Sequence, residues 1–562
     1  MNSSQFDHLS LREKIGQTCQ IHGKDVNEIE GGRLQAFFSE YPVGSIFLGS
    51  EIISSKSEGA GQLQKLIADC QTASRIPLSI AGDLENGSGG AIQGMTAFPN
   101  LLALGAVNDP AAAYEYGRWT AMEATRVGFN WNFGPVVDLS LNWLNPVVSI
   151  RSLGQSQERV AELAAALIRG SQEHGLSATA KHFPGDGIDF RDQHLCVTIN
   201  SLSEDKWQES FGHVYKVCFG AGVHAVMAGH IALPWMDPRT GTGRAPLPAT
   251  ASRHILDGLL REKLGYKGVV VSDALIMAGF RGRASLHEDL IIEAFNAGID
   301  VMLWPGSGYF ELMERAIERG RISMDRLDQS VKRIWEMKAH QGLFTKDVEG
   351  RQKDAAITVS TAKPLEETED FAEALAERSL TLVENRRGIL PLNPAKIKRV
   401  QILLATPKEQ GAEKRMSPLL KGMKARGMEV DFHVNGNCLD LRGKEAAGER
   451  YDALIAVFEL STHGLKNTMR PTGAMAECMW TIQGLETMNP IVVSLGSPYL
   501  LYDMPWAETY LNTYSPNSYT LRALERALFG EISFEGVSPV RLEDPWTVLE
   551  GKYLQHRAPV SI

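Results

Sequence analysis

Short apolar runs alternate with longer amphipathic segments along the first half of the chain. The apolar runs have the length of buried strands, and the longer segments repeat apolar residues with a helical period. Strands are expected at 44–48, 77–81, 130–135, 176–182, 225–228, 268–272 and 300–304, and helices at 61–73, 111–127, 158–174 and 251–264. Seven or eight strand–helix units over about 340 residues predict a parallel sheet closed into a TIM-like (β/α)8 barrel.

The pattern changes after a helix expected over 324–342. Residues 344–363 are polar and lack either period, which is typical of a linker. Beyond it, apolar strands and helices alternate again over a shorter length, at 400–405, 430–434, 453–459 and 491–495 for strands and 418–426, 474–488 and 518–529 for helices. We therefore predict an α/β protein with a catalytic barrel over 1–343, a linker over 344–363, and a smaller doubly wound α/β sandwich over 364–562.

Composition narrows the class of protein. The 562 residues are 43% hydrophobic and 22% charged, which is typical of a globular protein with a large core. The net charge of −10 and the lack of a basic tract argue against a nucleic-acid partner, and no run of about 18 apolar residues predicts a membrane span. The first residues do not form a signal peptide, and the six cysteines show no paired spacing, so a cytoplasmic protein with reduced thiols is expected.

Polar side chains follow the predicted strands directly. In a parallel barrel the carboxyl ends of the strands meet at one rim, where barrel enzymes carry their active sites. The residues expected at this rim are Asp83, Glu85, Asp138, Lys181, His182, His230 and Asp273. This convergence indicates an enzyme.

The loop over 181–194, KHFPGDGIDFRDQH, concentrates the candidate chemistry. Pro184 and two glycines end the strand and begin a charge-dense loop. Charged loop residues usually face water, but Lys181, His182, Asp192 and His194 together favour a site.

The same loop resembles the KHFPGxG and Asp-x-His motifs of glycoside hydrolase family 3, within its β-N-acetylglucosaminidase subgroup. Further collinear segments resemble the family along nearly the whole chain: LREKIGQ at 11–17, GDLENG at 82–87, NFGPVVDL at 132–139, RSLG at 151–154, VVVSDAL at 269–275, NAGIDVML at 296–303, ILPL at 389–392 and PIVVSLGSPY at 490–499. The resemblance implies a barrel followed by an α/β sandwich, and an oligosaccharide or amino-sugar substrate. The absence of metal-ligand spacing near the loop predicts an enzyme without a cofactor.

The resemblance also implies roles for individual residues. Asp273 would be the nucleophile of a retaining reaction, and His194 the general acid/base, held in one tautomer by Asp192. Asp83, Arg151, Lys181 and His182 would bind sugar hydroxyls. The chain departs from the family pattern at Asn86, Asp186 and Gln193, where glycine, histidine and serine or threonine are common, so the natural glycoside (cell-wall fragment, muropeptide or chitin fragment) stays open.

Several alternatives remain at this point. Asp273 alone would also suit a helix cap, and His230 would suit either the rim or the core. A metal-dependent hydrolase using His182, Asp192, His194 and His230 lacks the usual ligand spacing. A family 3 β-glucosidase, a β-N-acetylglucosaminide phosphorylase and a carbohydrate-binding protein without activity are the other candidates. The sequence is compatible with a monomer or a homodimer.

Overall fold

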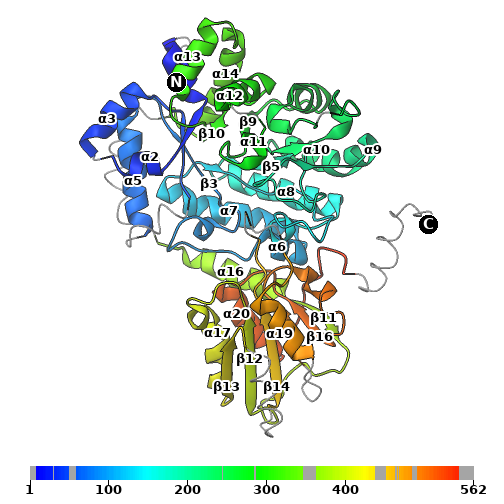
Figure 1. The fold of residues 1–562 in the computed structure, drawn as a ribbon. Coiled ribbons are helices and arrows are strands. Elements are labelled where there is room, and N and C mark those ends of the chain that lie inside the picture. The colour runs from blue at the N-terminus through cyan, green and yellow to red at the C-terminus, as the bar shows by residue number, and fades with distance from the viewer. Residues whose placement is uncertain are drawn as a thin grey trace, which may run out of the picture. The chain divides into compact units, whose positions relative to one another are not determined.

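The computed structural model describes residues 8–29, 31–49, 59–243, 245–283, 286–345, 363–436, 451–462, 465, 468–483 and 490–542 (Figure 1). They form two compact units. Unit 1 comprises Met1–Ala97, Asp109–Asn142 and Gln157–Glu369, and unit 2 comprises Phe98–Asn108, Trp143–Ser156 and Asp370–Ile562. Most of the predicted linker, 344–363, lies outside the described residues.

Unit 1 is the predicted parallel barrel. Five strands pair in the order β10-β1-β2-β3-β4 and three in the order β5-β7-β9. Single bridges join the two sheets, from Trp131 to Ser177 on one side and from Val271 to Val301 on the other. The strands are β1 (Cys19–His22), β2 (Ser45–Phe47), β3 (Ser79–Gly82), β4 (Trp131–Asn132), β5 (Thr179–Phe183), β7 (Ala225–Ala228), β9 (Val269–Ser272) and β10 (Met302–Leu303), with a further short pair β6 (Thr198–Ile199) and β8 (Ile231–Ala232).

Helices connect these strands. They are α1 (Leu11–Gln17), α2 (Lys24–Asn27), α3 (Gly31–Glu40), α5 (Ala60–Ala73), α7 (Pro110–Val127), α8 (Gln157–Gln172), α9 (Glu204–Trp207), α10 (His213–Gly220), α11 (Ala278–Arg281), α12 (His287–Ala297), α13 (Tyr309–Glu318) and α14 (Met324–His340). The helix expected over 251–264 is a π-helix, η7 (His254–Lys263), and shorter turns are η2 (Ser88–Gly90), η4 (Gln208–Gly212), η5 (Pro234–Met236) and η6 (Ala249–Ala251).

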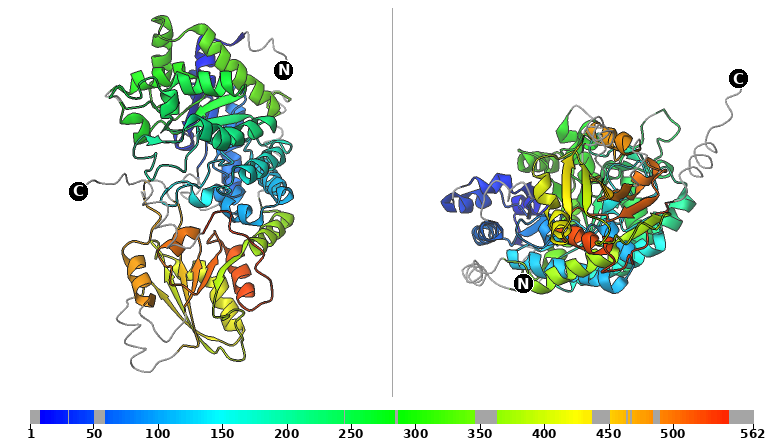
Figure 2. Two further views of the ribbon diagram at one scale, coloured as in Figure 1. Left: turned by 90° about the vertical axis from the view of Figure 1, so that its right-hand side faces the viewer. Right: turned by 90° about the horizontal axis from the view of Figure 1, so that it is seen from below.

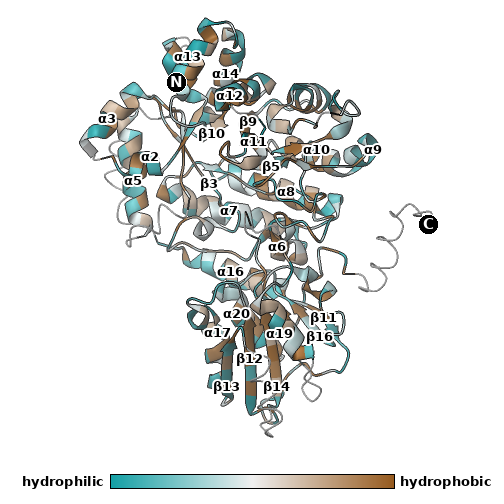
Figure 3. Cartoon of the chain, in the orientation of Figure 1, coloured by the Kyte–Doolittle hydropathy of each residue, from teal (hydrophilic) through white to brown (hydrophobic). Residues whose placement is uncertain are grey.

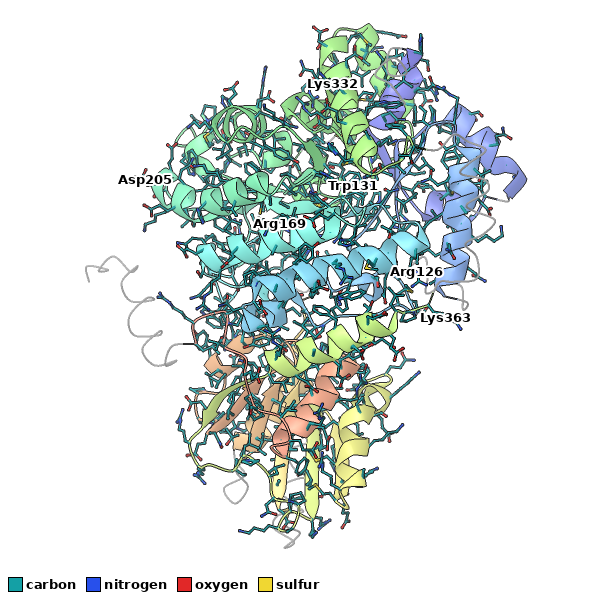
Figure 4. The ribbon with its side chains drawn as sticks, turned by 180° about the vertical axis from the view of Figure 1, so that it is seen from behind. Arg126, Trp131, Arg169, Asp205, Lys332 and Lys363 are labelled. Carbon is teal, nitrogen blue, oxygen red and sulfur yellow. The ribbon has the colours of Figure 1, made fainter. Side chains whose placement is uncertain are left out.

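Aromatic and branched side chains fill the barrel. Trp131, Phe133, Met227 and Val271 belong to one buried cluster inside the strands, and Figure 4 shows Trp131 in the interior of the unit, far from Asp205 at its outer edge. The Trp131 indole donates to the Thr179 hydroxyl at 2.8 Å, so its polar atom is satisfied in the core.

A buried carboxylate, Asp300, joins two helices near the amino-terminal end of the barrel strands. Asp300 is fully buried and accepts from Arg261 at 2.8 Å, from Arg333 at 2.9 Å and from Ser330 at 2.7 Å. Burial raises the pKa of Asp300, but the charges of Arg261, Arg333 and Arg326 outweigh burial and hold this pKa below its ordinary value. Asp300 is therefore ionised and links η7 to α14.

Unit 2 is a doubly wound sheet with the order β11-β16-β15-β14-β12-β13, in which β11 is antiparallel. Its strands are β11 (Thr381–Asn385), β12 (Arg399–Ala405), β13 (Glu429–Val434), β14 (Ala453–Phe458), β15 (Pro490–Ser494) and β16 (Thr509–Asn512). Its helices are α6 (Leu101–Val107), α17 (Ala412–Ala425), α19 (Ala474–Gln483) and α20 (Ser518–Leu528), with α16 (Glu366–Ser379) reaching it from unit 1 and the turns η3 (Ser149–Arg151) and η8 (Pro498–Tyr502).

Both faces of this sheet are covered, as a sheet of apolar strands requires (Figures 2 and 3). Ile402 and Leu404 point to the face that packs against α17 and α20, whereas Leu403 and Ala405 point to the face that packs against α19. The predicted sandwich fold is therefore confirmed in unit 2.

Unit 2 also contains two segments that precede the predicted boundary in sequence. Leu102 of α6 and Ile150 of η3 share a buried cluster with Tyr499, Tyr514 and Val540. These segments therefore fold with the C-terminal sheet.

Candidate active site

The end of β5 places two basic residues, Lys181 and His182, at the carboxyl-end rim of the barrel. The peptide bond between Lys181 and His182 is cis. Lys181 is only 2% exposed, and its Nζ lies 2.7 Å from Asp83 Oδ1 and 2.6 Å from Glu85 Oε1. The Asp83 side chain remains half exposed. Lys181 thus fixes the loop after β3 while a carboxylate oxygen of Asp83 stays accessible to a ligand.

Asp138 orients His182. This fully buried carboxylate accepts from the His182 ring at 2.7 Å, from the His182 backbone at 3.1 Å and from the Asp186 backbone at 2.7 Å. Because a carboxylate only accepts, the His182 Nδ1 must carry the proton, which leaves Nε2 for other groups. Asp138 was expected at the rim but had no assigned role, and the structure makes it the orienting group of His182.

The loop after β5 is held by its own charges. Gly185 has φ +118°, and a Cβ there would lie 2.1 Å from the Phe211 ring, so only glycine fits.

Asp189 accepts from Arg191 and from the Ile199 backbone. Burial raises the pKa of Asp189, but these hydrogen bonds outweigh burial and lower this pKa. Asp189 and Arg191 therefore shape the loop.

Asp192 and His194 form a dyad on this loop. Asp192 is fully buried and accepts from the His194 backbone at 2.8 Å and from His194 Nδ1 at 2.6 Å. The His194 side chain is 31% exposed. The carboxylate holds the proton on Nδ1, so any proton exchange between His194 and a substrate would take place at Nε2.

Asp273 follows β9 and lies within electrostatic reach of three histidines. Its carboxylate is half buried and accepts from the Ala274 backbone at 2.7 Å. Burial raises the pKa of Asp273, but His182, His230 and His194 outweigh burial and hold this pKa below its ordinary value. Asp273 is thus ionised at neutral pH, as a carboxylate nucleophile must be.

His230 contacts the backbone next to Asp273, and the sequence left its role open. It is fully buried, and its Nε2 donates to the Ala274 carbonyl at 3.1 Å while Nδ1 accepts from the Thr250 hydroxyl at 3.0 Å. Burial lowers the pKa of His230, and the nearby Asp273 carboxylate opposes this effect. His230 therefore positions the backbone next to Asp273.

Gln193 joins the dyad loop to this support. It is 1% exposed and its Oε1 accepts from the His230 backbone at 3.2 Å. The Ala278 backbone, just after Asp273, donates to the His194 carbonyl at 3.0 Å. The Asp-x-His loop and the segment after Asp273 therefore form one bonded assembly, which pattern reasoning did not detect.

Arg151 is the remaining predicted site residue. It ends η3 in unit 2, where its guanidinium donates to the Val147 carbonyl at 3.3 Å. Its contact with a sugar stays a prediction.

Two further properties concern only the described part of the chain. In those residues, no group of three or more His, Cys, Asp or Glu side chains is arranged to hold a metal ion. Nor does any helix there combine the length and apolarity needed to cross a membrane.

Comparison with known proteins agrees with this fold. Residues 10–337 match the description "Glycosyl hydrolase family 3 N terminal domain". A "Beta-N-acetylglucosaminidase/beta-glucosidase" from Cellulomonas fimi is 32% identical over 498 residues, covering 84% of this chain and 85% of the relative. The solved structure of a beta-glucoside phosphorylase covers 96% of this chain and 95% of its own, with 27% identity and a TM-score of 0.83. A family 3 β-N-acetylglucosaminidase from Paenibacillus covers 95% and 99%, with 26% identity and a TM-score of 0.82. The chain belongs to glycosyl hydrolase family 3 and is a glycoside hydrolase.

Proposed function

We propose that the chain is a retaining, exo-acting β-N-acetylglucosaminidase that removes terminal β-linked N-acetylglucosamine. The observation that carries this proposal is the Asp192–His194 dyad, bonded at 2.6 Å on a loop that is itself bonded to the segment after Asp273. Relatives named as β-N-acetylglucosaminidases and β-hexosaminidases support the substrate.

In the first step, the Asp273 carboxylate attacks the anomeric carbon and the glycosidic bond breaks. His194 donates its Nε2 proton to the departing oxygen, while Asp192 stabilises the charged imidazole. Asp273 and the sugar then form a covalent ester, and the alcohol leaves.

In the second step, neutral His194 accepts a proton from water at Nε2, and the activated oxygen attacks the anomeric carbon. The ester bond breaks and Asp273 leaves as a carboxylate, so the β configuration is retained. Asp83, Lys181, His182 and Arg151 are proposed to hold the sugar hydroxyls, with charged hydrogen bonds of about 1.5–3 kcal/mol each.

The test compares aryl β-N-acetylglucosaminide, β-glucoside and β-xyloside as substrates, and follows the anomer first formed by NMR. Preferential release of β-N-acetylglucosamine supports the proposal, and initial formation of the α-anomer would refute retention. A product of inverted configuration would also exclude Asp273 as nucleophile.

Phosphorolysis is a second candidate, favoured by the similarity to a beta-glucoside phosphorylase. A histidine acid/base does not place a second carboxylate against an incoming phosphate, so phosphate is an electrostatically feasible acceptor. Assays with and without phosphate separate the two reactions, because phosphorolysis yields a sugar phosphate.

A further inference from the structure

An aromatic slot lies beside the first strand of the barrel, on its outer side. It has a volume of about 520 Å³, within the range of small-molecule sites. Cys19 and Ile21 on one face of β1 form its inner wall. Its other walls are largely aromatic or apolar and come from α3, α13 and the loop before α13, namely Phe37, Tyr41, Trp304, Pro305, Tyr309 and Phe310.

Two residues of the slot lining, Ile276 and Trp304, lie near the candidate active site in the chain and in the sheet. Leu303, which precedes Trp304, accepts from the Leu275 backbone at 3.1 Å and donates to the Ser272 hydroxyl at 3.0 Å. Trp304 therefore follows β10 directly beside β9, the strand that precedes Asp273. Ile276 lines the slot and lies three residues after Asp273.

Exposed apolar side chains border the same region. Ile276 is 52% exposed, and Leu195, next to His194, is 44% exposed. The hydrogen bond from Ala278 to His194 makes the 276–278 segment run beside the dyad loop. A general acid must face the leaving group, so apolar side chains on these segments border the aglycone side of the site.

The polar groups of the slot define which aglycone fits. Asp25 accepts from the His22 backbone at 3.0 Å, and Glu311 pairs with Arg12 at 2.9 Å. Arg12 offsets the charge of Glu311, but the described lining of the slot contains no lysine or arginine that could pair with an anionic aglycone, so an uncharged one is favoured. The Trp304 indole nitrogen has no hydrogen-bond partner among the described residues, but it is enclosed and offers no donor to the aglycone, so Trp304 contributes an apolar ring face to the slot.

We propose that this slot binds the aglycone and selects β-N-acetylglucosaminides that carry an uncharged alkyl or aryl group. The inference rests on the proposed function for the sugar half of the substrate. The alkyl group enters past Ile276 and extends along the aromatic walls of α3 and α13.

The test uses ethyl, butyl and hexyl β-N-acetylglucosaminides, whose leaving alcohols have nearly equal acidity. Differences in kcat/KM between them therefore report binding of the chain. Each buried methylene is expected to raise kcat/KM by about threefold to fourfold until the slot is filled. Binding of the same compounds to Asp273→Ala is measured by calorimetry, and Kd is expected to fall in parallel.

Variants locate the effect. Ile276→Asp should remove the dependence of kcat/KM and of Kd on the length of the alkyl chain, and Ile276→Leu should preserve it. Leu286→Ser is the matched control, because Leu286 is a 65% exposed apolar residue outside the slot.

Two results would overturn the slot proposal. One is that kcat/KM and Kd do not change with the length of the alkyl chain. The other is that they change with chain length equally in the wild type and in Ile276→Asp. Complete absence of turnover on every N-acetylglucosaminide would instead overturn the proposed function, and the calorimetric series would still decide the role of the slot.

Discussion

Replacing Asp192 with asparagine perturbs His194 without removing its imidazole. Asp192 accepts two hydrogen bonds from His194, and the bond from Nδ1 is 2.6 Å long. A hydrogen bond to a charged group contributes about 1.5–3 kcal/mol, and 1.36 kcal/mol corresponds to a factor of ten in rate. If this bond stabilises the imidazolium that forms in the transition state of the second step, Asp192→Asn should slow turnover of a disaccharide roughly 10- to 150-fold.

The same variant should affect an activated aryl glycoside much less in the first step, because a phenolate needs little protonation to leave. The second step should still suffer, since an amide group donating to Nδ1 favours the tautomer whose Nε2 carries the proton and cannot accept another. The assay is pre-steady-state release of the phenol followed by steady-state turnover, where a burst is expected. Equal losses on both substrates, or no loss on either, would refute the role of Asp192.

Three other predictions concern the acid/base, the cofactor and stability. His194→Ala should reduce disaccharide hydrolysis by about 10²–10⁴, while an activated aryl substrate still forms the covalent intermediate; comparable losses on good and poor leaving groups would show that His194 only binds sugar. Activity should survive exhaustive chelation, and loss that a divalent ion restores would revive a metal mechanism. Asp300→Asn should lower the free energy of unfolding by about 3–5 kcal/mol, because it leaves arginines buried without their anion. Since the folded-state pKa of Asp300 is lowered, its stabilisation is present above about pH 4 and is lost on further acidification, so denaturant unfolding of the variant should depend less on acid pH than that of the wild type.

Hydrophobic period was sufficient to predict most of the barrel. The strands expected at 225–228 and 268–272 correspond to β7 (Ala225–Ala228) and β9 (Val269–Ser272), because continuous apolar runs are typical of strands buried on both faces. β1 was not predicted, because its sequence CQIH is half polar and therefore lacks such a run, and because it follows α1 almost directly. Gln20, between the slot-facing Cys19 and Ile21, is fully buried, and no local pattern signals a buried amide.

The second domain shows the same limit. Four of its parallel strands were expected, but β11 and β16 were not, because their sequences TLVEN and TYLN mix polar and apolar residues and give no continuous apolar run. β11 pairs antiparallel with β16, with Thr381 opposite Asn512. Likewise, the packing of Leu102 and Ile150 against Tyr514 depends on long-range contacts that periodicity cannot detect.

Residues on the site loops were predicted better than the groups that hold them. Lys181, His182, Asp192 and His194 stand out as a charged cluster after a strand, whereas Glu85, Asp138 and Gln193 act through partners far away in sequence. Glu85, for example, lies 2.6 Å from the ammonium of Lys181, almost a hundred residues away. Positions of this kind become visible only when strand ends are brought together by the barrel.

Trapping the proposed covalent intermediate and locating it in the chain tests the central mechanism, attack by Asp273, most directly. A 5-fluoro β-N-acetylglucosaminyl fluoride should react with the enzyme through its good leaving group and then hydrolyse slowly, so the ester accumulates. Mass spectrometry of the intact protein should show one added sugar, and peptide mapping should place it on Asp273. His194→Ala should still be labelled, because fluoride needs little protonation. A label on another residue, or continued labelling of Asp273→Ala, would contradict the account.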